Sequence, residues 1–302
     1  MNREVAVLKK EYPDVTSGTK TIAGMQKDTL FQIFKYSVYL LIFINVIEFT
    51  REDYLASAHT FRNGIDAWSQ FFDAYATTLD SIAWFVLLLM FELETYVIPD
   101  EKFVGKTRWA VQITGIICLL LVLQAFIGYW DKYTVMDAFA LSVFDNACSA
   151  LGTVQSYATD LDEYFALNAQ NCAAISGTSI YIHDANSLLA SSEILDRMKS
   201  LALTDVINAG TWILIVIVLE IDVLLQMRGE LTHKLYRINV YFKSILYFVL
   251  FAAAVYWGIS SALLDFWDAM LWIIAFFFIE LNLFQWNEET TDKTITSQEV
   301  PL

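Results

Sequence analysis

The sequence predicts an all-α integral membrane protein with six transmembrane helices. Hydrophobic residues make up 57% of the 302 residues, more than the roughly 45–50% usual in soluble domains. Six mostly apolar windows have the length of about 20 residues that a helix needs to cross a bilayer: 30–50, 81–98, 109–130, 206–227, 239–261 and 269–286. Lipid offers the backbone no hydrogen-bond partners, and these runs lack the alternation of barrel strands, so we expect helices.

The regions outside the spans divide the chain in order. Residues 1–29 form a polar N-terminal tail without the apolar core and cleavage site of a signal peptide, so the first span is expected to direct insertion. Residues 30–286 form the six-helix domain, and residues 287–302 form a C-terminal tail. Between the third and fourth spans, residues 131–205 are expected to be a partly helical insertion on one side of the membrane.

The distribution of basic residues predicts the orientation in the membrane. The two tails and the short connections near 99–108 and 228–237 carry twelve Lys and Arg residues, whereas the opposite face carries five. By the positive-inside rule, both termini lie in the cytoplasm and residues 131–205 lie on the extracytoplasmic side of the cell (inner) membrane.

The outward face is also strongly acidic. It holds seventeen Asp and Glu residues against its five basic ones, in a chain whose net charge is −15. Such a surface attracts cations and repels nucleic acid, so no nucleic-acid partner is expected. A simpler interpretation, in which acidic loops serve only solubility, stays open.

Two of the three cysteines fall in the outward insertion. Cys148 and Cys172 are 24 residues apart, in a compartment where oxidation is possible, and the sequence predicts a structural disulfide between them. Cys118 lies inside the third span and is expected to be a buried apolar residue. The sequence contains no CxxC, HExxH or Cys/His cluster, so no metal site is predicted.

Three of the spans contain a shared pattern. The segments 80–94, 208–222 and 268–282 each read Asp or Asn, three residues, Trp, seven apolar residues, Glu, Leu or Ile, and then Glu, Asp or Asn. The pattern predicts three repeated two-helix units, made of spans 1–2, 3–4 and 5–6. Trp and Glu are eight residues apart, which is a rise of about 12 Å in a helix.

This spacing assigns a depth to each polar position. The tryptophans fall near the outer interface, where this residue is favoured, and are expected to be anchors: Trp84, Trp212 and Trp272. The first acids of the three copies then share a depth near the midplane. They form the predicted ion-binding or proton-relay site: Glu92, Glu220 and Glu280.

The last position of the pattern has a different expected role. Lys35 and Lys243 are the two basic residues within the spans, and each lies at the depth of a last-position acid. The sequence therefore predicts the secondary ion pairs Lys35–Glu94 and Lys243–Asp222, with the neutral Asn282 in the third copy. This pairing leaves the three site glutamates without a cation.

An unpaired carboxylate within the membrane takes up a proton or binds a cation. Two other interpretations of the glutamates stay open. They could serve as neutral polar contacts between helices, or they could form a docking surface for another membrane subunit.

Several cofactor classes are excluded by residue type. No histidine lies in any span, which excludes bis-histidine haem, and no lysine lies at mid-span, where a retinal Schiff base would need one. No later span carries arginine at every third position, so voltage sensing would lack its gating charges. The sequence also lacks a glycine-rich phosphate loop and a GxSxG nucleophile motif. No cofactor, no catalytic residue and no enzymatic activity are predicted.

The function predicted from the sequence is that of a cation- or proton-conducting or coupled membrane protein, a channel or transporter component with an intramembrane acidic site. The alternative is a non-catalytic structural or accessory subunit of a larger membrane complex. Expected partners are membrane lipid, a monovalent or divalent cation or a proton, and either further copies of the chain or another membrane protein.

Overall fold

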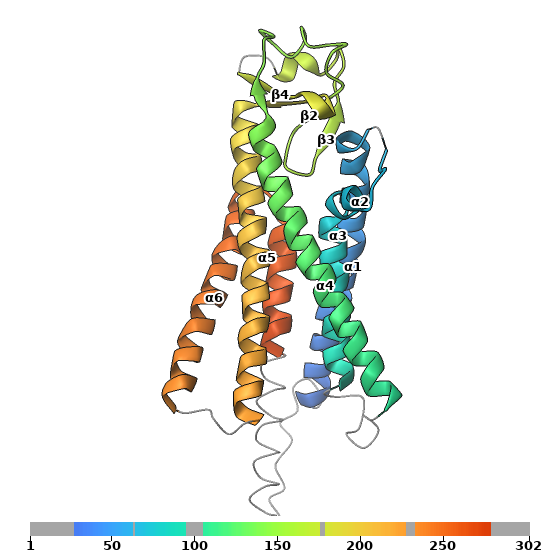
Figure 1. The fold of residues 1–302 in the computed structure, drawn as a ribbon. Helices are drawn as coiled ribbons and strands as arrows, with labels where there is room; N and C mark the ends of the chain where they lie inside the picture. The colour runs from blue at the N-terminus through green and yellow to red at the C-terminus, as the bar shows by residue number, and fades with distance from the viewer. Residues whose placement is uncertain (1–26, 63, 95–104, 176–178, 228–232, 279–302) are drawn as a thin grey trace, which may run out of the picture.

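A bundle of long helices carries a small β-sheet at one end, which we call the sheet end (Figure 1). The computed structural model describes residues 27–62, 64–94, 105–175, 179–227 and 233–278. The named helices are α1 (Lys27–Thr60), α2 (Trp68–Ala74), α3 (Ala76–Glu92), α4 (Lys106–Val135), α5 (Ser192–Met227) and α6 (His233–Ile259). A final helical segment covers residues 263–278.

The sheet end contains five short strands and three 3-10 turns. The strands are β1 (Ala140–Leu141), β2 (Ser156–Ala158), β3 (Tyr164–Ala166), β4 (Ile180–His183) and β5 (Leu188–Ser191), in the order β1-β4-β5-β2-β3. All pairs are antiparallel except the parallel pair β2–β5. The turns are η3 (Met136–Ala138), η4 (Cys172–Ile175) and η5 (Asp184–Asn186).

The insertion is partly helical, as expected, and it also contains a small sheet that was not predicted. Residues 137–158 have a helical-looking sequence but form η3, turns and short strands. Strands β1 and β2 of this stretch pair with strands that lie later in the chain, and this pairing overrides the local helical pattern. The stretch that begins at Ser192 is helical as expected and opens α5.

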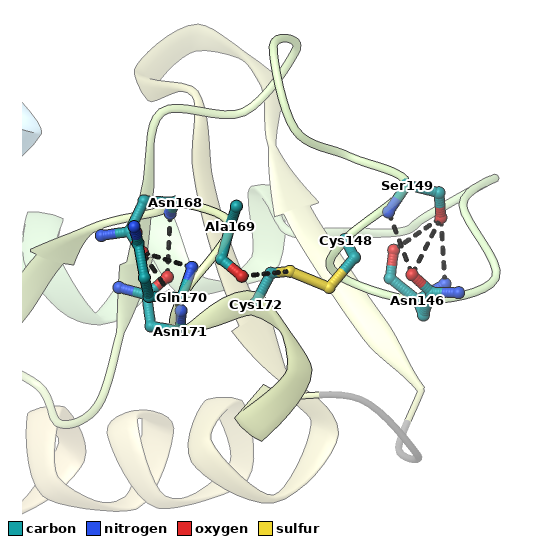
Figure 2. The surroundings of a disulfide bond; sticks show 8 residues. All are labelled: Asn146, Cys148, Ser149, Asn168, Ala169, Gln170, Asn171 and Cys172. Carbon is teal, nitrogen blue, oxygen red and sulfur yellow. Dashed lines mark hydrogen bonds between the residues drawn. A yellow bond between two sulfur atoms is a disulfide. The ribbon is translucent and has the colours of Figure 1, made fainter.

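The predicted disulfide is confirmed. Figure 2 shows Cys148 and Cys172 joined between two loops of the sheet end, with Cα atoms 4.9 Å apart. Ser149 closes one of these loops by bonding to Asn146, and Asn168 and Asn171 close the other. Cys118 is buried, as expected.

Several helices are long and apolar enough to cross a membrane. Among the described residues there are four, α1, α4, α5 and α6, and a fifth if the bent pair α2–α3 counts as one span. They are consistent with a membrane protein. Six spans and the repeat architecture are not confirmed, because α3 has 17 residues and the described part of the last segment stops at residue 278.

A break between α2 and α3 shapes the sheet end. The two helices meet at Tyr75 with a bend of 78°. Just beside the break, Gly128 lets α4 approach closely, since a Cβ atom there would lie 2.9 Å from the Ala76 Cβ. The break and this contact bring polar residues of α2, α3 and α4 close together at the sheet end.

Candidate functional site: an acidic chamber at the sheet end

A cavity of about 70 Å³ lies between the helices at the sheet end, and we call it the acidic chamber. Side chains from α1, α3, α4, α5, α6, the final segment and the β2–β3 loop line it. Seven of them are acidic: Glu52, Asp53, Asp80, Asp162, Asp205, Asp265 and Asp268. None of these seven is exposed, and no basic side chain occurs among the described lining residues.

Some of the acids are held by neighbouring helices. Asp53 of α1 accepts hydrogen bonds from the Thr78 backbone N–H (2.8 Å) and hydroxyl (2.7 Å) of α3. Asp268 accepts a bond of 2.8 Å from Asn45. Because each bond joins two helices, these carboxylates are positioned by the bundle itself.

Other polar atoms in the chamber wall are buried without a partner. Within the described part of the chain, Asp80 Oδ1, Asn208 Oδ1 and Trp257 Nε1 have no hydrogen bond. Trp257 is 5% exposed, and its indole N–H lies near the Asp205 carboxylate but outside hydrogen-bond geometry. Buried polar atoms without partners are rare and costly.

One cation borders the chamber. Lys132 of α4 bonds to Asp162 at 2.5 Å, and its charge also acts on Asp205 and Asp265. Burial raises the pKa of Asp265 well above its usual range, and the nearby carboxylates of Asp205, Asp162 and Glu52 raise it further. Burial and mutual repulsion therefore oppose full ionisation of the carboxyls in the chamber.

The three tryptophans of the repeat close the chamber on the side away from the sheet. They are 7–9% exposed and pack on one another and on Phe276. The Trp212 and Phe276 rings are 4.5 Å apart. The sequence predicted that Trp84, Trp212 and Trp272 anchor the protein at the lipid interface. In the structure these three side chains are buried in the bundle core.

The structure corrects the predicted partner of Lys35. Its Nζ lies 2.5 Å from Glu92 Oε1, and Tyr36 and Tyr39 also donate to the Glu92 carboxylate at 3.2 and 3.3 Å. Lys35 is 1% exposed and Glu92 is 5% exposed, whereas Glu94 is exposed. A buried ammonium is stabilised most by a buried carboxylate, and so Glu92 does not lack a cation.

Glu220 and Lys243 are the other predicted site residues whose side chains the structure describes. Glu220 is exposed on α5, where its charge acts on Glu94. Lys243 is partly buried on α6. Three of the predicted residues lie outside the described side chains: Asp222, Glu280 and Asn282.

The sequence analysis did not predict the chamber, although the sequence contains a signal for it. Asp80, Asn208 and Asp268 occupy the first position of the three repeated segments, and all three line the chamber. The signal was the repetition of a polar residue one helical turn before each tryptophan.

Comparisons with known proteins give no relative. No protein-family model matches the chain, and no curated protein or solved structure matches it. Function is therefore inferred from the geometry of the chamber.

Proposed function

We propose that the protein is a cation- or proton-coupled membrane protein, a component of a channel or transporter, and that the acidic chamber is its ion-binding site. One observation carries the proposal. Unpartnered polar atoms of α3, α5 and α6 converge on a cavity that seven carboxylates line.

The chamber has the size and polarity of a site for protons or a small hydrated cation. A volume of 70 Å³ accommodates about two water molecules at liquid density. Polar groups that could bind such water line the chamber, among them the Trp257 N–H and side-chain oxygens of Asp80 and Asn208. Because adjacent carboxylates cannot all stay ionised without a cation, the set shares protons or binds one.

The tryptophans on the side of the chamber away from the sheet favour ion coupling over an open pore. Trp84 lies one helical turn below Asp80 on α3, and Glu92 lies about 18 Å below Asp80 at 1.5 Å per residue. The tryptophan cluster fills the space between these two levels. Passage from the chamber to the Lys35–Glu92 pair therefore requires the rings to move.

Reconstituted vesicles test the proposal. We expect Asp80→Asn and Asp268→Asn each to lower proton or monovalent-cation flux at least tenfold, because Asn keeps the size of the side chain but cannot ionise. Asp137→Asn is the matched control, since Asp137 is exposed, pairs with Lys199 and does not line the chamber. Infrared difference spectra of the same variants should lose a protonated-carboxyl band.

Two results would oppose the proposal. Wild-type vesicles that pass neither protons nor cations at any potential, combined with unchanged infrared spectra in both chamber variants, would favour the accessory-subunit alternative. An equal loss of flux in the chamber variants and in Asp137→Asn would show that flux depends on the total charge at the sheet end and not on the chamber.

A further inference from the structure

A second and larger cavity lies beside the acidic chamber, between the sheet and the outer ends of α1, α2 and α4. We call it the sheet-end cleft. Its volume is about 650 Å³, within the range of about 300–1,000 Å³ typical of small-molecule sites. It shares three lining residues with the chamber, Asp53, Thr77 and Asp162, so the two cavities are neighbours.

The helix break brings two carboxylates together in the cleft wall. A Cβ atom on Gly128 would lie 3.9 Å from the Asp73 Cα, so α4 almost touches the end of α2. Asp131 is three residues after Gly128, on the same face of α4. The charges of Asp73 and Asp131 consequently act on each other, and both residues line the cleft.

Neither of these two carboxylates has a partner. Among the described residues, no ion pair or hydrogen bond reaches the side chain of Asp73 or Asp131. The two basic residues in the cleft wall are already engaged. Lys132 pairs with Asp162, and Arg62 donates to Gln155 at 2.7 Å and to Ser156.

One part of the remaining wall is aromatic and thioether, among other polar and small residues. Phe61, Met136, Phe139, Tyr164 and Met198 line the cleft. Aromatic faces attract organic cations, and methionine adapts to irregular apolar shapes. Unpaired carboxylates beside such a wall complement a molecule with a positive head and an apolar body.

We propose that the sheet-end cleft binds a small organic cation, an amine whose ammonium group lies between Asp73 and Asp131 and whose apolar part lies against the aromatic wall. This site is distinct from the ion site of the chamber, because a cavity of 70 Å³ is too small for such a molecule. An amine in the cleft lies next to the shared residues Asp53 and Asp162. It is therefore placed to cover the chamber on its outer side.

A matched series of probes tests this site in the purified full-length protein. 2-Phenylethylamine, 2-phenylethanol and 3-phenylpropanoate have similar apolar parts and carry a positive, a neutral and a negative head. We expect saturable binding of the amine in isothermal titration calorimetry and at least tenfold weaker binding of the other two. Asp131→Asn and Asp73→Asn should each weaken binding of the amine at least fivefold.

The control separates this site from the general charge of the outer face. Asp137→Asn removes the same charge from a residue outside the cleft and should leave the affinity for the amine unchanged. Asp131 is exposed and unpaired, so its variant is expected to fold normally, which the thermal midpoint checks. No saturable binding of the amine, or equal affinity for the amine and the alcohol, would overturn the proposal.

Discussion

The buried ion pair between Lys35 and Glu92 is the best-defined polar contact in the half of the bundle away from the sheet. It joins α1 to α3 in the core, and two tyrosine hydroxyls complete the shell of the carboxylate. Removing one member of a buried pair costs about 3–5 kcal/mol, because the other charge is stranded. Replacing both residues of the pair together lowers the free energy of unfolding much less.

The pair predicts a specific pattern in double variants. Lys35→Met alone should lower the free energy of unfolding by about 3–5 kcal/mol, and adding Glu92→Gln should restore most of the loss. Chemical unfolding in detergent measures both changes. Lys35→Met with Glu94→Gln is the control, and recovery in that variant instead would mean that Glu94 is the partner.

The raised pKa of Asp265 makes the stability of the protein depend on pH. Burial and neighbouring carboxylates disfavour ionisation of this carboxyl in the folded protein, whereas in the unfolded chain it ionises near its ordinary pKa of 3.8. A raised folded pKa stabilises the fold fully below the unfolded pKa and loses this contribution as pH rises towards the folded value. The folded protein should therefore weaken as the pH rises above the ordinary value of 3.8.

Thermal unfolding at increasing pH tests the effect. Wild-type protein should show a falling midpoint with rising pH, and Asp265→Asn should show a smaller fall because its side chain does not titrate. Asp145→Asn, in a loop of the sheet end, should keep the wild-type slope. An identical slope in wild type and Asp265→Asn would rule out this carboxyl as a source of the dependence.

At the scale of elements, the contact between α4 and the α2–α3 break organises both cavities. Gly128 allows this contact, since any larger residue would place its Cβ against Ala76. Gly115 occupies the same helix with no atom within 4 Å of its own Cβ position. The two glycines therefore differ in packing but not in helical context.

Alanine substitution should separate the two positions. Gly128→Ala should destabilise the protein by about 1–3 kcal/mol through overpacking, and it should weaken binding of 2-phenylethylamine by moving Asp131. Gly115→Ala should be neutral or stabilise α4 by up to about 1 kcal/mol, because alanine is the better helix former. Equal effects on unfolding would show that α4 can shift at no cost.

The disulfide also stabilises the sheet end. It closes a loop of 24 residues, for which the chain-entropy estimate is about 3 kcal/mol. Cys148→Ser with Cys172→Ser should raise hydrogen exchange in β4 and β5 and leave α3 unchanged. Intact-mass analysis after alkylation should find both thiols blocked in the wild type, and two free thiols would end the claim.

At the scale of the whole molecule, the chamber and the cleft lie at the end that the positive-inside rule places outside. Cysteine-accessibility labelling in intact cells tests this orientation. Asp160→Cys should react with an impermeant reagent from outside, and Lys293→Cys should be protected. Labelling of position 293 from outside would reverse the orientation and turn the chamber towards the cytoplasm.

The sequence by itself predicted several long apolar helices and their approximate places in the chain. Continuous apolar runs leave helices as the available spanning structure, and each predicted window overlaps an observed helical segment. The cysteine pair was also readable, because both residues lie in one outward insertion. These features depend on local composition and spacing, which are visible without a fold.

Tertiary structure alone decided which polar groups meet. Lys35 pairs with Glu92 and not with Glu94, because helix rotation buries one acid and exposes the other, and depth along the chain does not specify rotation. The repeated polar residue before each tryptophan became a chamber wall only when α3, α5 and the final segment packed together. The sheet depends on pairing between strands distant in sequence, so the helical pattern of its segments was misleading.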